Sequence, residues 1–401
     1  MANQLLTTQM ITREILRILS EKLTFLNKIN RSYDDRYART GAKIGDTLQI
    51  RVPTHGPIRQ GRIMQPGDLV DKVVPLAVAN QTGVDFTFSS AEMALDIDDF
   101  SERYLAQRVA DLAVNIESSV LTSSFAQIGA QVGDPDGRLT LNAALQAGKQ
   151  LTDQLAPAQP RYLMMNTAGN LQMVQDTKSL FNSQPLLADQ YADGIVARAA
   201  GFDWFESTVM PIIERGTATG YLTNGVPANG ATTLAVDTGT GAVAAGNVFT
   251  IVGVNAVHPQ TKADLGYLQK FVVTTAAGSG AGTWNISPAI TYSGPEQNVT
   301  AAPADSIGIT IDGTAGASST YGGNLAFSRD AVAFVTADLP LPPKKDASRM
   351  TWKGLSLRLI QDYDTINDMY LTRADVLWGS NVIRPELAVR IANDPTLLTP
   401  P

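Results

Sequence analysis

The sequence predicts an α+β protein that carries an inserted all-β domain. Stretches near the N-terminus have the apolar spacing of amphipathic helices, and strand-like segments follow them and return near the C-terminus. Between these parts lies a glycine-rich segment of short apolar strands. With 401 residues the chain can hold two or three domains and bury a sizeable core.

The first helix is predicted over residues 8–29, with Thr7 or Thr8 as its cap. Its charges are mixed in sign, which argues against a helix lying on a membrane surface. A terminal helix of this kind either docks on its own domain, the more common outcome, or on a neighbouring chain. Its apolar face consists of Ile11, Ile15, Ile18, Leu23 and Leu26.

Residues 45–88 predict an extended β-hairpin, with strands over 47–52 and within 73–88 and a tip rich in Pro and Gly. A hairpin of two strands is marginal in water, so something must cover it, and a neighbouring chain is one candidate. Arg51, Arg59 and Arg62 make the tip basic. Three interpretations remain open for them: a solvated face, an arm that forms salt bridges, or a nucleic-acid contact.

The longest predicted helix covers residues 98–125 and would span roughly 40 Å. Its apolar residues recur three and four positions apart, and charged residues fill much of the other face. Asp98 and Asp99 precede the first turn, where carboxylates accept free N–H groups. The apolar set is Phe100, Tyr104, Val109, Leu112, Ile116 and Val120, and the charged set is Glu102, Arg103, Arg108, Asp111 and Glu117.

The rest of the chain alternates helices and strands around the glycine-rich segment. Helices are predicted over 141–155 and 166–176, and a buried strand over 161–165. In residues 217–323 short strands at 233–236, 248–252, 270–274, 283–286 and 307–311 predict a small sandwich or barrel. Strands return at 327–335, 350–362 and 367–377.

Composition excludes several classes of function. The chain has no cysteine and only two histidines, so disulfides, thiolate chemistry and a histidine-based metal site are not expected. The net charge of −7 argues against dedicated nucleic-acid binding. Neither a membrane span nor a signal peptide is recognisable. Charged residues make up only 17%, which fits either a surface largely covered by other subunits or a neutral soluble protein.

No arrangement of residues predicts an active site, and we expect no cofactor and no metal. The carboxylates Asp96, Asp98 and Asp99 are explained by helix capping. The glycines in 278–282 lead into a strand and lack the Lys-Ser/Thr of a phosphate loop.

The order of these elements resembles the major capsid proteins of tailed bacteriophages, the Hong Kong 97-like fold. It is most similar to the coat proteins of short-tailed Salmonella phages, which carry an accessory β-domain at the same place. The resemblance is carried by three groups of residues. They are Ala200-Gly-Phe-Asp203 with Pro211, Phe327-Ser-Arg-Asp-Ala331, and Val376-Leu-Trp-Gly379 with Asn381 and Arg384-Pro-Glu386.

This resemblance implies a structural protein that assembles with itself, as hexamers and pentamers, into an icosahedral shell around double-stranded DNA. It implies a scaffolding protein and a portal as further partners, DNA enclosed without sequence-specific binding, and no membrane. Assembly would take place in the host bacterial cytoplasm, and the product would be the virion capsid. The implied regions are an N-terminal arm (1–44), an E-loop hairpin (45–88), a spine helix of the P-domain (89–129), the first part of the A-domain (130–216), the inserted all-β domain (217–323) and the return strands (324–401).

We expect the subunit interface to include Arg51, Arg59, Arg62 and Lys72 of the hairpin. Asp98, Asp99 and Glu102 of a neighbour are the candidate partners of Arg59 and Arg62. Some relatives crosslink through a lysine in this loop, and we expect no crosslink here. The alternative is a carbohydrate-binding or adhesive protein that uses 217–323 as its binding module; an enzyme ranks third.

Overall fold

A computed structural model describes residues 7–31, 47–53, 61–62, 72–89, 101, 105–177, 198–316, 319–343 and 345–398. The chain divides into two compact units. Unit 1 comprises Met1–Ile50, Val73–Val120 and Val332–Asn381. Unit 2 comprises Arg51–Lys72, Leu121–Ala331 and Val382–Pro401.

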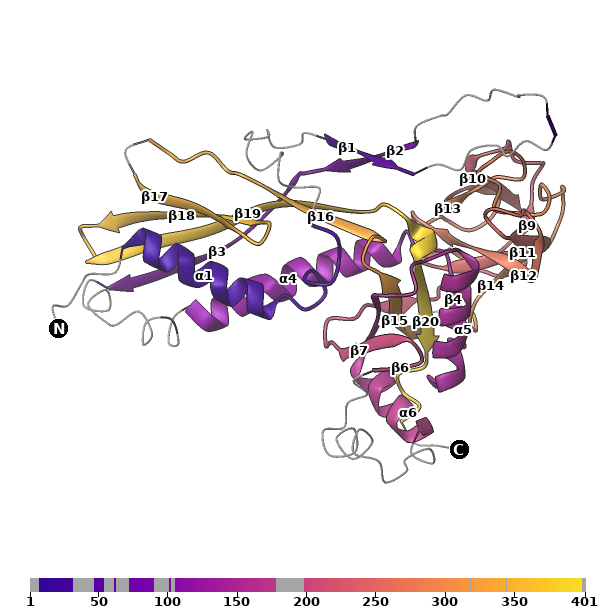
Figure 1. Cartoon of the computed structure of the whole chain (residues 1–401), viewed down its shortest axis with the longest axis horizontal. Coiled ribbons are helices and arrows are strands. Elements are labelled where there is room, and N and C mark those ends of the chain that lie inside the picture. The colour runs from indigo at the N-terminus through magenta and orange to yellow at the C-terminus, as the bar shows by residue number, and fades with distance from the viewer. Residues whose placement is uncertain are drawn as a thin grey trace. The chain divides into compact units, whose positions relative to one another are not determined.

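Unit 1 is built on a five-stranded sheet with the order β16-β19-β18-β17, in which β3 also pairs with β19 (Figure 1). The pairing of β3 with β19 is antiparallel and joins Asn80 to Trp378 and Ser89 to Met369, almost 300 residues apart in sequence. On β3 the side chains of Val84, Phe86 and Phe88 share the more buried face, as their alternation predicts. The strands are β3 (Asn80–Ser89), β16 (Val332–Ala337), β17 (Asp346–Trp352), β18 (Leu355–Asp364) and β19 (Met369–Val382).

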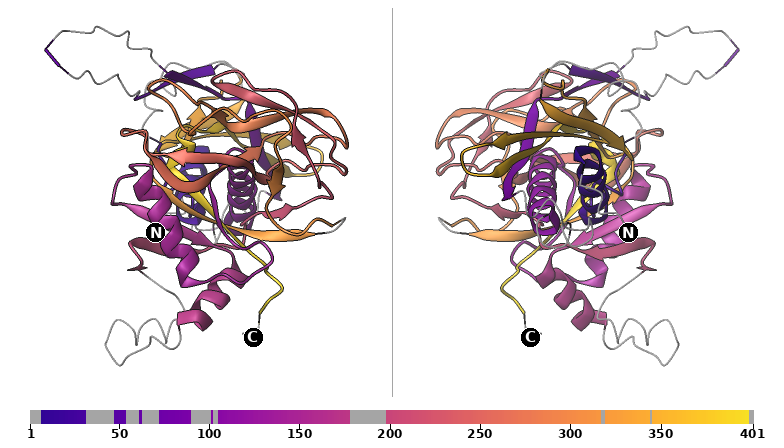
Figure 2. Two further views of the ribbon diagram at one scale, coloured as in Figure 1. Left: turned by 90° about the vertical axis from the view of Figure 1, so that its right-hand side faces the viewer. Right: turned by 90° about the vertical axis from the view of Figure 1, so that its left-hand side faces the viewer.

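Two helices lie side by side, α1 (Thr8–Lys22) and α4 (Ala106–Phe125), and both are seen nearly end-on in Figure 2. Helix α1 belongs to unit 1, as does α4 up to Val120. The Thr7 side chain caps α1 by accepting a hydrogen bond from the Met10 amide. The buried face of α1 packs on β17 and β18, which shows that this helix docks on its own chain. It ends at Lys22 rather than at residue 29. Of the helix predicted over 98–125, the structure describes Ser101 and the part from residue 105 onward.

The expected hairpin over 45–88 is only partly correct. Strand β1 (Thr47–Val52) pairs with β2 (Lys72–Ala77) in a two-stranded sheet, as expected. The second half of the predicted return strand is a separate strand, β3, which belongs to the five-stranded sheet. The reason is that β3 finds a ten-residue partner in β19, which supplies far more ladder bonds than six-residue β1 could.

Unit 2 contains a seven-stranded mixed sheet with the order β4-β20-β15-β5-β7-β6, to which β8 adds on β15. Helix α5 (Leu141–Asp153) packs on β20, β4 and β15, and α6 (Thr167–Thr177) packs beside α5. The strand predicted over 161–165 is β5, in the interior of the sheet. The strands are β4 (Gln131–Gly133), β5 (Arg161–Met165), β6 (Arg198–Ala199), β7 (Phe202–Glu206), β8 (Ile212–Glu214), β15 (Thr320–Ser328) and β20 (Ala388–Asn393).

The glycine-rich segment forms a six-stranded antiparallel sheet with the order β14-β11-β12-β13-β10-β9 (Figure 1). The two end strands meet, because Leu222 bridges Gly308 and the Ile309 amide donates to the Tyr221 carbonyl at 3.0 Å. The sheet therefore closes into a barrel. The sequence pattern had predicted either a sandwich or a barrel. Its strands are β9 (Leu222–Thr223), β10 (Ala231–Asp237), β11 (Val248–Val257), β12 (Asp264–Val273), β13 (Gly282–Ile290) and β14 (Ile309–Ile311).

Two predicted bounds differ from the strand ends of the structure. The insertion is predicted over 217–323, and β15 of the seven-stranded sheet begins at Thr320, with Gly322 and Gly323 paired to Asn393 and Ala392. The strand expected over 327–335 is two strands, because a turn at Arg329 and Asp330, closed by a hydrogen bond from the Ala331 amide to the Ser328 carbonyl, separates β15 from β16.

Candidate assembly interface

The strand pair β1–β2 has one covered and one open face. Ile50 and Leu76 are buried, and the Asn381 side chain donates to the Pro75 carbonyl at 2.8 Å, so part of the cover comes from the same chain. The opposite face is exposed and includes Arg51 and Val73. The hairpin is thus half covered within the subunit, and its other face is open to a partner.

Three of the predicted interface residues lie in the described part of the chain. Arg51, Arg62 and Lys72 are exposed, and neither Arg62 nor Lys72 has an ion-pair partner among the described residues. Arg59, Asp98, Asp99 and Glu102 lie outside the described residues. Their predicted pairing therefore stays a prediction.

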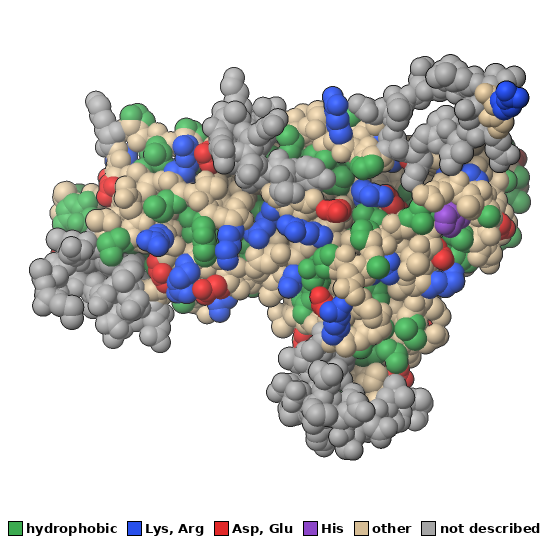
Figure 3. Space-filling view, in the orientation of Figure 1, with side chains coloured by type: hydrophobic (Ala, Val, Ile, Leu, Met, Phe, Trp, Pro, Cys, Tyr) green, Lys and Arg blue, Asp and Glu red, His purple; other side chains and the backbone are tan. Residues whose placement is uncertain are grey.

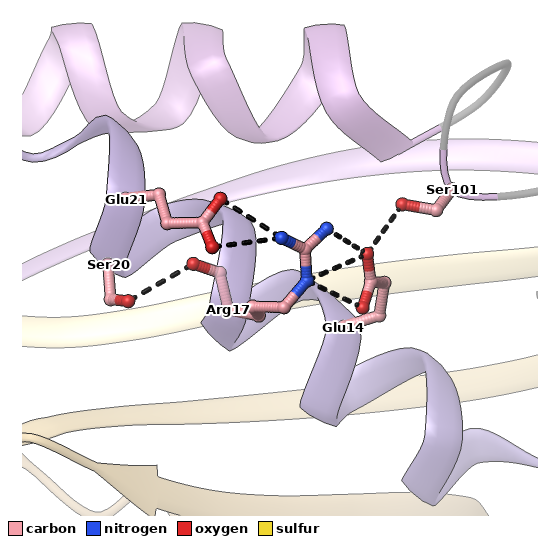
Figure 4. A network of polar contacts seen from close by, with 5 residues as sticks. All are labelled: Glu14, Arg17, Ser20, Glu21 and Ser101. Atoms are coloured by element: carbon pink, nitrogen blue, oxygen red, sulfur yellow. Dashed lines mark hydrogen bonds and ion pairs between the residues drawn. The ribbon is translucent and has the colours of Figure 1, made fainter. Parts of the chain in front are cut away.

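A charged network on α1 joins this helix to the chain just before α4 (Figure 4). Arg17 contacts Glu14 at 2.6 Å and Glu21 at 2.9 Å, and the Ser101 hydroxyl donates to Glu14 at 2.7 Å. The hydrogen bond from Arg17 lowers the pKa of Glu14, and Ser101 adds to the effect. Arg17 and Glu21 are largely exposed, so these pairs contribute little to stability.

The predicted position of Glu117 was wrong. The residue pattern placed its side chain on the polar, solvent-facing side of the long helix, but it is buried. It is only 4% exposed. Its carboxylate accepts hydrogen bonds from the Phe25 amide at 2.7 Å, the Leu26 amide at 3.2 Å and the Thr24 hydroxyl at 3.1 Å. Burial raises its pKa, although these hydrogen bonds oppose the shift. Glu117 thus fastens the chain that follows α1 to the middle of α4.

Sequence reasoning also missed two buried arginines in unit 2, because an arginine in a strand or linker ordinarily faces water. Arg215 is 4% exposed and donates to the carbonyls of Gly313 at 3.0 Å, Ala218 at 3.2 Å and Ile311 at 3.4 Å. Burial lowers the pKa of its guanidinium, because the charged form is desolvated.

Arg390, on β20, is 1% exposed. It donates to the carbonyls of Gly246 at 2.8 Å and Phe125 at 3.1 Å and to the Tyr321 hydroxyl at 3.2 Å. Its guanidinium also lies over the Phe125 ring, 5.2 Å from the centroid. Burial again lowers the pKa of the arginine, and burial raises the pKa of Tyr321.

The described residues offer little that would hold a cofactor or metal. They contain no group of three or more His, Cys, Asp or Glu placed to bind a metal ion. A cavity of about 210 Å³ opens where the barrel meets α5, and Lys262, Tyr267 and Gln154 are among its lining residues. Burial raises the pKa of Tyr267 to about 12. None of the described helices has the length and apolar character needed to cross a membrane.

Two aromatic residues of the barrel, Trp284 and Tyr221, are buried and are not available to a sugar-binding platform. Trp284 and Tyr221 are each 1% exposed and pack against each other in the barrel core, with ring centroids 4.9 Å apart. On the face shown in Figure 3, basic and acidic side chains are dispersed among neutral and hydrophobic ones. The burial of Trp284 and Tyr221 counts against a carbohydrate-binding site built on these two residues.

Comparison with known families gives a match over nearly the whole chain. The family model of the P22 coat protein, gene protein 5, matches residues 1–391. No curated protein matches the chain.

Solved structures of phage shells are similar to this chain at low identity. The structure of Mycobacterium phage Che8 has a TM-score of 0.46 and 12% identity and covers 92% of this chain and 90% of its own. The capsid structure of Cyanophage P-SCSP1u has a TM-score of 0.42 and 12% identity, with 92% of each chain covered. The CUS-3 coat protein I-domain has a TM-score of 0.19 and 29% identity and covers 24% of this chain and 94% of its own.

The whole-length sequence match defines a structural protein of a phage shell and not an enzyme. The chain belongs to the P22 coat protein family, whose model spans residues 1–391. It is therefore a major capsid protein with the Hong Kong 97-like fold and a component of the virion capsid, and it assembles with itself into the shell. The predicted fold class, family and function are confirmed.

Proposed function

We propose that the shell is held together by the open face of the β1–β2 strand pair, which reaches a neighbouring subunit. In this assignment residues 1–44 form the N-terminal arm, 45–88 the E-loop, 89–129 the spine helix, and 130–216 and 324–401 the A-domain and return strands around the insertion. The observation that carries the proposal is an exposed cationic hairpin. Arg51 lies on the open face of β1–β2, and Arg62 in the tip and Lys72 at the start of β2 are exposed and have no acidic partner among the described residues.

The proposed partners of Arg51, Arg59, Arg62 and Lys72 are Asp98, Asp99 and Glu102 of the adjacent subunit. A single exposed ion pair contributes only about 0.2–1 kcal/mol. A closed shell repeats the same contact around every symmetry axis, so weak pairs sum to a stable particle.

The test is the double variant Arg59→Gln/Arg62→Gln. We expect slower assembly at low salt and a weaker dependence on salt than in the native chain, because screening acts on the pairs that the variant lacks. Light scattering follows the rate, and negative-stain electron microscopy gives the yield of closed shells.

The matched control is Arg329→Gln/Lys353→Gln, which removes two cations from exposed turns outside the strand pair. A charge swap gives a further test. Arg59→Glu/Arg62→Glu alone should impair assembly, and adding Asp98→Lys/Asp99→Lys should restore it. If yield and salt dependence matched those of the control, the pairing would be wrong.

We also propose that a scaffolding protein guides assembly and that a portal occupies one vertex. The weakness of exposed pairs supports this, because weak contacts alone do not select one closed size. Assembly of purified chain with and without added scaffold tests this, and uniform closed shells from the chain alone would contradict it.

The net charge of −7 supports a container that encloses DNA without binding it tightly. A gel shift of DNA by the unassembled chain would contradict this.

A further inference from the structure

The chain enters the barrel after Arg215 and leaves it near Gly313. Hydrogen bonds hold both of these crossings. Arg215, which immediately precedes the barrel, donates to Gly313 and Ile311 at the point where the chain leaves it. The outgoing chain is also held by Asp136, whose carboxylate accepts from the Thr314 amide at 2.9 Å and the Thr314 hydroxyl at 2.8 Å. The entering and leaving chains are thus tied to each other and to the chain before α5.

A second set of contacts joins further barrel residues to the chain around these crossings, to β20 and to the chain after α4. Arg390 reaches the Gly246 carbonyl in the turn before β11, and the neighbouring Asn247 side chain donates to the Glu214 carbonyl at 2.6 Å. On the barrel wall, the Ser287 hydroxyl donates to the Gln127 carbonyl at 2.8 Å, just beyond the end of α4. Lys270 and Gln131 both contact the Asp312 carboxylate, at 2.5 and 3.0 Å.

We call the contacts between the barrel and the rest of unit 2 the seam. At Gly129 the two backbones are packed so closely that the barrel cannot shift along the seam. A Cβ atom added at Gly129 would come within 2.8 Å of the Ser287 carbonyl and 3.2 Å of the Lys270 carbonyl, both backbone atoms of the barrel. A barrel that hung on flexible linkers would show neither this close backbone approach nor buried directional bonds at several separate points.

We propose that Arg215 and Arg390 are positioning residues that set the angle at which the barrel is presented, and that this angle is one determinant of shell curvature. A guanidinium has donors in a fixed planar fork, so it can hold two or three carbonyls in one relative arrangement. Neither arginine has an ion-pair partner among the described residues, and the Arg390 Nε–H has no acceptor there. Buried charge without a counter-ion is a poor source of stability, so the role of these residues is orientation.

The test exploits the absence of cysteine, which allows two spin labels to be placed at will. Ala281→Cys on the barrel and Gln146→Cys on α5 place the two labels at exposed positions. In the otherwise native chain we expect a narrow distribution of label-to-label distances. In Arg215→Lys and in Arg390→Lys we expect the distribution to become about twofold broader, because an ammonium cannot hold the spread carbonyls together.

The matched control is Arg161→Lys. Arg161 also donates to backbone carbonyls, of Pro157 at 2.7 Å and Ala156 at 2.8 Å, but it lies at the start of β5 and donates to no barrel residue. This variant should lose similar hydrogen bonds and keep the narrow distribution. Tyr321→Phe, which removes only one acceptor of Arg390, serves if Arg390→Lys does not fold.

Shells assembled from the same variants give the second readout. At a temperature where each subunit is folded, we expect Arg215→Lys and Arg390→Lys to give a wider spread of shell diameters and more open or spiral particles than Arg161→Lys. Unchanged distance distributions in both seam variants would overturn the positioning role. Broadened distributions with uniform shells would overturn the link to curvature.

Discussion

Glu117 shows how one buried carboxylate joins two helices. Its three hydrogen bonds all come from residues 24–26, so the chain after α1 is held at a fixed height along α4. Burial destabilises the charged form of Glu117, and the hydrogen bonds offset this only in part. The pKa of Glu117 is therefore raised above its ordinary value of 4.5.

This raised pKa predicts a pH dependence of stability. The folded chain binds a proton at Glu117 more tightly than the unfolded chain, so the contribution of this site to stability is complete below pH 4.5 and is lost as the pH rises through the folded-state pKa. In Glu117→Gln this titration is absent. We expect the unfolding free energy of the native subunit minus that of Glu117→Gln to fall as the pH rises above 4.5, measured by urea unfolding.

The matched control is Asp111→Asn, on the exposed side of the same helix. This variant keeps Glu117, so its unfolding free energy minus that of Glu117→Gln should fall with pH in the same way as for the native subunit. A difference between native and Glu117→Gln that stayed constant with pH would contradict the prediction.

At the scale of elements, the strand β19 is shaped by one glycine. A Cβ atom at Gly379 would clash with the Ala77 carbonyl and approach the Val78 Cα at 3.0 Å, and these backbone atoms cannot move aside as a flexible side chain can. The end of β2 therefore lies directly against β19. This contact holds the end of β2 in place on β19.

We predict that Gly379→Ala lowers the free energy of unfolding by about 1–3 kcal/mol, as overpacking does elsewhere. Chemical denaturation measures the change. Gly282→Ala is the matched control, because a Cβ atom at Gly282 meets nothing within 4 Å. Equal stability of the two variants would show that β2 can shift without cost.

Local elements were predictable from sequence, whereas their partners were not. The cap at Thr7 and the strand at 161–165 depend on neighbouring residues, and both were correct. The pairing of β3 with β19 depends on a register between segments almost 300 residues apart, and no local pattern specifies it. Glu117 and Arg390 were missed for the same reason, since the groups that bury them lie far away in sequence.

At the scale of the whole molecule, we predict that no covalent bond joins the subunits of the shell. The chain has no cysteine, and Lys72 is the sole lysine between Lys43 and Lys149. We predict that shells boiled in detergent release a single band at the subunit mass of 42.8 kDa, with or without reductant. Gel electrophoresis of native shells and of Lys72→Arg shells tests this, and a ladder of multiples that Lys72→Arg abolishes would contradict it.

The closure of the barrel between β9 and β14 has a consequence for crowding. A shell brings many copies of this domain together at a fixed high density, and an open sheet would present free edges that could pair with the same edge of the next copy. Because Leu222 and Gly308 join the two ends of the sheet, those edges are already paired. The domain can therefore be repeated over the shell with little risk of sheet-to-sheet polymerisation. Mutations that separate β9 from β14 are expected to convert assembly into aggregation.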